Sequence, residues 1–342
     1  MDTVAISVNN DSRARAIALY AAIAVGLVIV SLASLGVGAG NLADAGLRST
    51  LLVLRASRLA SGLLVGAALG VAGVLVQGLF RNPLADASVI GTSAGAAFGG
   101  KALLVAVELL FAGHAIRWIP NDAVLTVGCL GGALLSLLLV LAFVRRSSDV
   151  LSLVLTGFLL SSLFLSLGSL VTSLAQERWE LGRAVVAFAL GDLSGAGPEH
   201  VRLALPLVTG GIAAGWFWAR PLDVLLCGDE EAASLGVDVK QVRQCCILWV
   251  AVLTAGAVAI GGNVGFVGLL VPHALRPLLG VDHRRLVPAA ALGGALFVAA
   301  CDLAVRLAPG RSEIPLGVVT GLVGAPVFLA LLNRVRAGAV DG

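Results

Sequence analysis

Long apolar runs, separated by short groups of charged residues, dominate the pattern along the chain. Residues 59–80, for example, form an uncharged run that lies between Arg58 and Arg81. A membrane-spanning helix needs about 20 predominantly apolar residues, so each run of this kind predicts one span. We therefore predict ten transmembrane helices, over residues 16–35, 59–80, 88–111, 123–144, 150–176, 203–219, 244–260, 264–279, 286–305 and 314–333.

The seventh and eighth of these helices come from a single uncharged run over residues 244–272. This run is too long for one straight span. Gly261, Gly262 and Asn263 lie inside it, and both residue types are typical of turns because they tolerate backbone conformations that other residues avoid. The pattern therefore predicts a break at these three residues.

The composition supports a membrane protein. Of the 342 residues, 58% are hydrophobic and 13% are charged, and the mean hydropathy is +1.01, whereas a soluble domain carries about 25% charged residues. So few charges disfavour a soluble enzyme, a disordered chain and a nucleic-acid-binding protein. We predict an all-α polytopic protein surrounded by membrane lipid, with a transmembrane domain at residues 16–335 between cytoplasmic tails at 1–15 and 336–342.

The charged residues between the runs predict the orientation of the chain. More lysines and arginines fall on the side of the N-terminus, which the positive-inside rule places in the cytoplasm, and ten spans bring the C-terminus to the same side. The longest polar stretch there, residues 221–243, predicts a short helix that Asp229 caps and Gly236 ends. This helix is either a docking element or an ordinary loop helix. On the outer side, residues 181–190 predict a short surface helix.

Residues 95–102 come within one position of a phosphate-binding loop, but the match fails where the chemistry needs it. Ala102 stands where a Ser or Thr hydroxyl would hold Mg²⁺, and no strand precedes the segment. Gly91, Gly95 and Gly99 recur every four residues, which is typical of close helix packing in membranes. We therefore expect no nucleotide site. The cysteines and histidines also lack the spacing of a metal or catalytic centre.

A few charged residues fall in or near the predicted spans, where charges are costly and often functional. They could form a proton relay, which would favour a proton-coupled secondary transporter, or they could lie at loop ends and between packed helices. An intramembrane enzyme would need a nucleophile or metal constellation that the sequence does not contain. His114 and His200 fall on the outer side, as loop residues or as transient haem contacts. The relay candidates are Lys101, Glu108, Asp192 and Asp302.

Arginines also gather at the outer ends of two predicted spans, against the positive-inside bias. Arg55 and Arg58 stand three residues apart at the start of the second span, so a helix places them on one face. Arg306 and Arg311 lie just past the ninth span. These residues are either interfacial anchors or a site for carboxylates of a partner protein, which guanidinium groups bind well.

Several segments together resemble the FecCD-type permeases, the membrane subunits of importers for ferric siderophores, haem and vitamin B12. LFRNPLAD at 79–86 resembles the stretch after the second helix of that family, and LRASR at 54–58 is similar to the start of that helix. GFVGLLVPHALRPLLG at 265–280 looks like the most distinctive signature of the family. GDEEAASLGVDV at 228–239 and EIPLGVVTGLVGAP at 313–326 resemble its coupling segment and the start of its final helix.

The resemblance implies a type II ABC importer permease in the bacterial inner membrane. Two copies would form a homodimer with the pathway on its axis. A periplasmic or lipid-anchored substrate-binding protein would dock outside, and two separate ATPase subunits, which bind ATP and Mg²⁺, would dock inside. This chain would itself bind no cofactor or metal and have no catalytic residue. Asn82, with Val150 and Leu151, would form the cytoplasmic gate, although the family usually has small polar residues at the last two positions.

The resemblance also assigns docking roles to charged residues. Arg55, Arg58 and Arg306, with Arg311 beside them, would receive the substrate-binding protein. Since the chain lacks an ATP site, the energy for transport has to come through differential contact between a partner and the two states of the permease. The helix that makes this contact would consist of Asp229, Glu230, Glu231, Ala232, Ala233, Ser234, Leu235 and Gly236.

Overall fold

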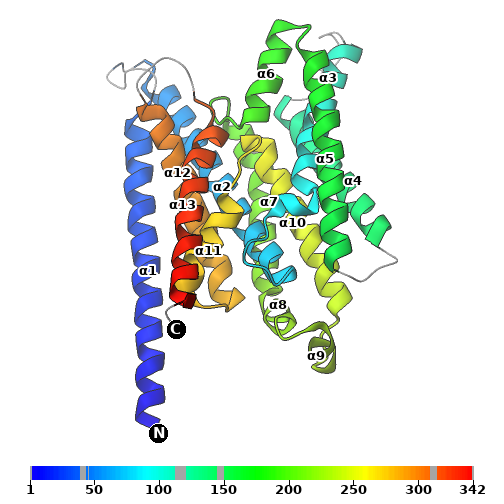
Figure 1. Ribbon diagram of the computed structural model, residues 1–342. Coiled ribbons are helices and arrows are strands. Elements are labelled where there is room, and N and C mark those ends of the chain that lie inside the picture. Colours follow the sequence, from blue (N-terminus) through cyan, green and yellow to red (C-terminus); the bar gives the residue numbers. More distant parts are fainter. Residues whose placement is uncertain are drawn as a thin grey trace.

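The computed structural model describes residues 2–38, 44, 46–111, 121–144, 150–308 and 314–340, and all regular structure in this part of the chain is helical. Ten helices cover the predicted spans and shorter ones lie between them (Figure 1), so the all-α fold class is confirmed. The long helices are α1 (Asp2–Gly36), α2 (Arg48–Leu79), α3 (Thr92–Phe111), α4 (Asn121–Val144), α5 (Val150–Ala175), α7 (Pro198–Phe217), α10 (Val239–Gly261), α11 (Val267–Leu279), α12 (His283–Leu307) and α13 (Leu316–Val340). The short ones are η1 (Ala87–Ile90), α6 (Trp179–Leu190), α8 (Ala219–Leu225) and α9 (Asp229–Ser234).

Not every long helix crosses a membrane by itself. Among the described residues, α1, α2, α4, α5, α10 and α12 are long and apolar enough to do so, and α7 and α8 meet the same criterion only when taken together, across a bend of 48°. Helix α11 has 13 residues, so it rises by about 20 Å. That length is less than the apolar thickness of a bilayer, about 30 Å, so α11 crosses only part of it.

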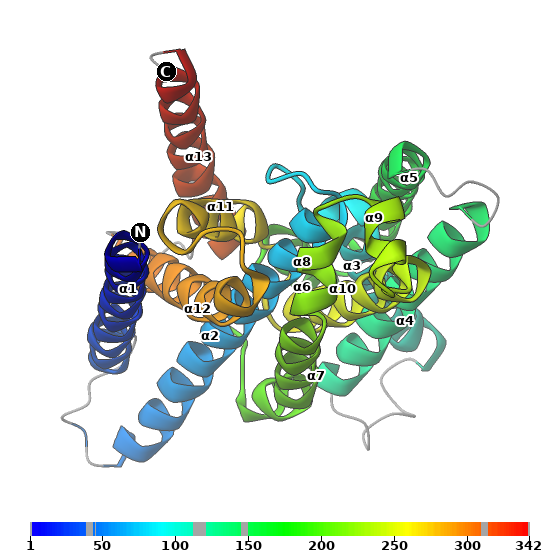
Figure 2. The same ribbon diagram turned by 90° about the horizontal axis from the view of Figure 1, so that it is seen from below.

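Helix α2 lies at the centre of the molecule, where it packs against α10, α11 and α12 (Figure 2). Close approach depends on glycine: a Cβ added at Gly66 would lie 2.1 Å from the carbonyl oxygen of Gly294 on α12. Helices α3 and α4 pack in the same way, since a Cβ at Gly99 would lie 2.2 Å from the carbonyl oxygen of Gly128. The glycine spacing therefore serves helix packing, as the sequence predicts.

The predicted break between the seventh and eighth spans is confirmed. Helix α10 ends at Gly261 and α11 begins at Val267. Between them, the backbone N–H of Asn263 donates to the carbonyl of Phe188 at 3.3 Å, which ties the break to α6. Phe266 has a left-handed φ of 68°, and this non-helical backbone delays the start of α11 beyond the predicted residue 264.

The two predicted short helices are present as α6 and α9. The expectation that Asp229 caps α9 is wrong: Gly228 holds the N-cap position, and Asp229 is the first helical residue. Its carboxylate is instead engaged by two arginines, Arg81 and Arg243. Gly236, with a φ of 83°, follows the end of α9 as predicted.

Both chain ends lie at the end of the bundle that carries α8 and α9, whereas α6 lies at the opposite end (Figure 1). This arrangement agrees with an even number of spans. Residues 2–15, which were expected to be a tail, continue α1, because no glycine or proline interrupts them. We refer to the end with α9 as the inner end and to the end with α6 as the outer end.

Candidate functional site

At the inner end, the carboxylate of Asp229 joins three segments of the chain. Its Oδ1 pairs with Nη2 of Arg81, in the turn that follows α2. Its Oδ2 pairs with Nη2 of Arg243 on α10, at 2.6 Å. One side chain at the start of α9 therefore holds this short helix against both α2 and α10.

The rest of α9 combines one buried anchor with an exposed surface. Ala232 is fully buried, whereas Ala233 and Glu230 are exposed and Leu235 is 69% exposed. The Ser234 hydroxyl donates to the carbonyl of Glu231 at 2.7 Å, which closes the last turn locally. A short helix that is anchored on one side and exposes small, apolar and acidic side chains on the other is suited to docking against a partner.

The turn after α2 carries the predicted gate residue Asn82. Arg81 adopts a left-handed φ of 50°, which directs the chain away from the axis of α2. The Asn82 N–H donates to the carbonyl of Gln77 at 3.1 Å, and its side-chain oxygen accepts from the N–H of Leu84 at 2.9 Å. This residue therefore shapes the turn that follows α2.

The segment after this turn contacts α5. The Ser161 hydroxyl of α5 donates to the carbonyl of Ser88 in η1 at 3.1 Å, and a Cβ added at Gly157 would lie 2.1 Å from the carbonyl of Val89. Val150 and Leu151 occupy the first turn of α5, and their side chains lie outside the described part of the structure. The gate assignment of these two residues and Asn82 stays a prediction.

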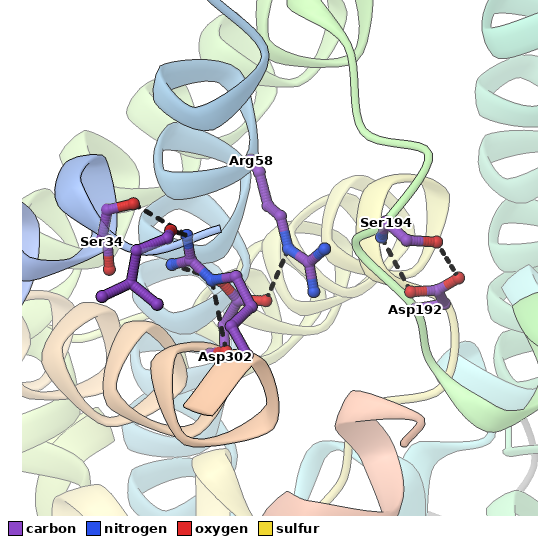
Figure 3. A network of polar contacts seen from close by, with 7 residues as sticks. Ser34, Arg58, Asp192, Ser194 and Asp302 are labelled. Carbon is purple, nitrogen blue, oxygen red and sulfur yellow. Dashed lines mark hydrogen bonds and ion pairs between the residues drawn. The ribbon is translucent and has the colours of Figure 1, made fainter. Parts of the chain in front are cut away.

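At the outer end, a second carboxylate accepts two arginines. Asp302 of α12 is 2% exposed; its Oδ1 lies 2.8 Å from Nε of Arg58 and its Oδ2 lies 2.9 Å from Nη2 of Arg306. Figure 3 shows Arg58 directed toward Asp302, with Ser34 of α1 beside the same network. Asp302 is thus a structural ion-pair partner that joins α2 to α12.

The same cluster holds the end of α1. Arg55 donates from Nη1 to the carbonyls of Leu35 and Gly36, each at 2.9 Å. Arg306 donates from Nη1 to the carbonyls of Ser34 and Val37, at 2.8 and 3.0 Å. The last carbonyls of a helix lack partners within the helix and carry partial negative charge, so guanidinium donors stabilise them.

The four arginines predicted to receive a partner are therefore not equivalent. Arg55 is 7% exposed and turns toward α1, whereas Arg58 turns toward α12, so the two do not present one common face. Within the described residues, Arg58 uses only Nε, which leaves its two terminal nitrogens available. Arg311 lies outside the described residues. Docking at these arginines stays a prediction.

The four relay candidates do not meet. Lys101 is 8% exposed and donates from Nζ to the carbonyl of Gly168 at 3.1 Å, so it ties α3 to α5. Glu108 faces Arg178 at 3.8 Å, and Asp192 accepts from the N–H of Ser194 at 2.7 Å. With Asp302 paired to arginine, each candidate has its own local role.

Other candidates also have structural roles where the chain is described. His200 accepts from the N–H of Gly197 at 3.2 Å, at the start of α7, and His114 lies outside the described residues. Residues 95–102 lie within the helix α3. Cys129, Cys246 and Cys301 are buried, and no group of His, Cys, Asp or Glu in the described parts is close enough to hold a metal ion.

Besides the pairing of Asp302 with Arg58 and Arg306, two further arrangements were not predicted from the sequence. One is the pairing of Asp229 with Arg81 and Arg243, which come from three different segments. The other joins α8 to α12: the fully buried His283 lies with Nδ1 2.6 Å from Oδ1 of Asp223. The only sequence signal for the first was that Arg81 belongs to the LFRNPLAD segment.

A model of the FecCD transport family matches residues 15–334. The cobalamin import permease BtuC of Halobacterium salinarum is 37% identical over 83% of this chain and 74% of its own length. The hemin transport permease HmuU of Yersinia pestis is 34% identical over 91% and 93%. A solved inward-facing ABC transporter, assigned to the metal-chelate type, has a TM-score of 0.81 and 29% identity, covering 93% of this chain and 99% of its own.

Proposed function

This chain belongs to the FecCD transport family and is a multi-pass membrane permease of the ABC importer type, and we propose that it forms the translocation pathway for an iron chelate or cobalamin. Ferric siderophores and haem are the iron chelates in question. The support comes from the two relatives, which are named for cobalamin and for hemin. The metal-chelate type of the solved neighbour agrees with a bulky metal complex as cargo.

The proposed assembly is a homodimer in the bacterial inner membrane with both chain ends in the cytoplasm. Two ATPase subunits dock at the inner end, where they bind ATP and Mg²⁺, and a substrate-binding protein docks at the outer end. Two observations support this orientation: the chain ends share a side with α9 (Figure 1), and loops on that side carry more positive charge.

The single observation that carries the proposed ATP-driven function is that α9 is anchored on one side and exposed on the other. Its buried Ala232 and its paired Asp229 fix the helix to the permease, while Ala233 and Leu235 remain exposed. A rigid exposed helix provides the differential contact by which an ATPase could favour one state of the permease over the other. We therefore assign the coupling role to the whole of α9 and the two residues after it.

At the outer end, we propose that Arg58 makes the direct contact with the substrate-binding protein. Within the described residues its two terminal nitrogens have no partner, so they can bind a carboxylate, whereas Arg55 and Arg306 are engaged by carbonyls of α1. These two arginines would then act by positioning the docking surface, and Arg311 would extend it. At the inner end, Asn82, Val150 and Leu151 are the proposed gate; Asn82 precedes η1, which contacts α5.

The test is uptake by the permease reconstituted in vesicles with its ATPase and binding protein. Ala233→Arg would place a long charged side chain on the exposed face of α9, and we expect it to abolish ATP-driven uptake while the protein still inserts. Ala232 is unsuitable for this test because it is fully buried. Val281→Arg, an exposed position between α11 and α12, is the matched control and should retain uptake.

The same vesicles distinguish an importer from a proton-coupled transporter. An importer requires the ATPase and ATP and works without a proton gradient, whereas a secondary transporter works without the ATPase. Uptake that follows a proton gradient in the absence of ATP would overturn the proposal. Comparing a ferric siderophore, haem and cobalamin as competitors for uptake would then identify the cargo.

A further inference from the structure

The ion pairs of Asp229 connect the proposed coupling helix α9 to two other segments of the chain. The carboxylate binds Arg81, which directly precedes the proposed gate residue Asn82, and it also binds Arg243 on α10. Its partners are only partly exposed, with 35% of the Arg81 side chain and 18% of the Arg243 side chain accessible. The proposed coupling helix therefore touches the turn of the gate through one side chain.

The contacts continue from this turn to α5. Residues 82–91 form a compact segment, in which the Asp86 carboxylate accepts from the Ser88 hydroxyl at 2.7 Å and caps η1. Ser88 in turn accepts from Ser161 of α5 through its carbonyl at 3.1 Å. A displacement of Arg81 is thus passed on by a hydrogen-bonded segment rather than absorbed by a loose loop.

Helix α10 provides a fixed point for the same carboxylate. Its residues are buried from Val250 to Gly261, with few exceptions, and it packs against α2, α4 and α7. Arg243 lies in its second turn and is directed to Asp229. Asp229 is therefore held on one side by a long packed helix, through Arg243, and on the other by Arg81, which lies in a turn.

We propose that Asp229 is a positioning residue that transmits movement of α9, through its ion pair with Arg81, to the segment 82–91 and to α5. The proposal rests on the assignment of α9 as the coupling helix. It adds a specific path between ATPase docking and the gate. A change in coupling requires a contact that differs between two states, and an ion pair between separately held segments is such a contact.

The main experiment measures uptake and ATP hydrolysis by the complete complex in vesicles. Arg81→Gln removes the proposed link but leaves the surface of α9 intact. We expect the ATPase to remain bound and active while uptake per ATP hydrolysed falls about tenfold, within the usual range of coupling between sites. Arg81→Lys, which keeps the charge, should retain part of the coupling. Arg220→Gln, an exposed arginine on α8, is the matched control and should couple normally.

A double-mutant cycle separates a link from two independent effects. If Asp229 and Arg81 act as one contact, Asp229→Asn combined with Arg81→Gln should uncouple no more than the stronger single variant. Additive losses would overturn the proposal. So would normal coupling in Arg81→Gln, because Asp229 would then act on the ATPase alone.

Hydrogen–deuterium exchange gives a readout that a purely structural role would not change. In the wild-type complex, ATP should alter exchange in both α9 and residues 82–91. In Arg81→Gln, the response of α9 should persist while that of 82–91 disappears. A response of 82–91 that persists in this variant would overturn the proposal, even if the variant complex is less stable.

Failure of this inference is distinguishable from failure of the proposed function. If Ala233→Arg leaves coupling intact, then α9 is not the coupling helix and both ideas fail. If Ala233→Arg uncouples the complex but Arg81→Gln does not, the proposed function stands and the path through Arg81 is rejected.

Discussion

Near each end of α2 one carboxylate pairs with two arginines, but the outer carboxylate is buried and the inner one is partly exposed. At the outer end, Asp302 accepts Arg58 and Arg306 with 3% of its side chain exposed. At the inner end, Asp229 accepts Arg81 and Arg243 with 41% of its side chain exposed. A buried pair is costly to break because an uncompensated charge remains, whereas an exposed pair contributes little. We therefore expect the outer arrangement to act as a fixed joint between helices and the inner one, whose ion pairs are easier to break, as an adjustable joint.

The partners of each cluster support this difference. Arg306 and the neighbouring Arg55 also bind the last carbonyls of α1, so the outer end of the bundle joins α1, α2 and α12. The inner cluster joins the bundle to α9, a helix of 6 residues with most of its surface exposed. Four substitutions test this difference between the two ends.

Asp302→Asn should destabilise the protein most. It removes the charge of a buried carboxylate that pairs with Arg58 and Arg306, whose side chains are 19% and 7% exposed, and removal of one member of a buried pair costs roughly 3–5 kcal/mol. Thermal unfolding in detergent measures the loss. The control is Glu199→Gln, since the exposed pair of Glu199 with Arg202 should contribute about 0–1 kcal/mol. Equal effects of the two variants would remove the basis for a fixed joint.

Gly66→Ala should come next, because α2 links the two clusters and approaches α12 closely. The new Cβ would lie 2.1 Å from the Gly294 oxygen, and overpacking of this kind costs about 1–3 kcal/mol. Gly131→Ala on α4 is the matched control, since nothing lies within 4 Å of the added atom. If thermal unfolding is the same for both variants, the close approach is not a constraint.

Arg58→Lys should weaken docking of the binding protein while the fold is retained. Lysine keeps the charge near Asp302 but lacks the forked donors that suit a carboxylate, so we expect a loss of about 1 kcal/mol in binding. Affinity in nanodiscs at low and high salt measures it. Arg48→Lys, at the exposed start of α2, is the control. Unchanged affinity for Arg58→Lys would leave this residue with a structural role only.

Asp229→Asn should have the smallest effect on stability. Its ion pairs are partly exposed, so the expected loss is about 1 kcal/mol or less, far below that of Asp302→Asn. Thermal unfolding under the same conditions compares the two carboxylates directly. A loss at position 229 as large as that at position 302 would contradict an adjustable joint at the inner end.

Much of the fold could be predicted because each membrane span needs about 20 predominantly apolar residues, and such runs are visible in the sequence. Ten apolar runs mark ten helices, and Gly261–Asn263 mark the break between α10 and α11. The short helices α6 and α9 also follow from local signals. The start of α11 was misplaced because the left-handed conformation of Phe266 is not a property of phenylalanine but of the surrounding packing.

The candidate site was predictable only as a set of residues. Motifs that resemble the FecCD family singled out Asn82, Asp229 and the outer arginines, but they did not reveal the partners of these side chains. Arg55 and Arg58 illustrate the limit: helical spacing places them together, yet one binds the end of α1 and the other binds Asp302. Asp229 was expected to cap its own helix, but its carboxylate instead pairs with Arg81 and Arg243, which are distant in the sequence.

The fold class, the order of the helices and the family can be inferred from the amino-acid sequence, because hydrophobicity, glycine spacing and motifs are local properties of the chain. Which charges meet, and which of them are buried, depends on the packing of the folded chain. Residues 58 and 302, or 81 and 229, are far apart in sequence, and their pairing depends on how the helices pack. The energy of a charge depends on its partners and on its exposure to water, and neither quantity is encoded at a single position.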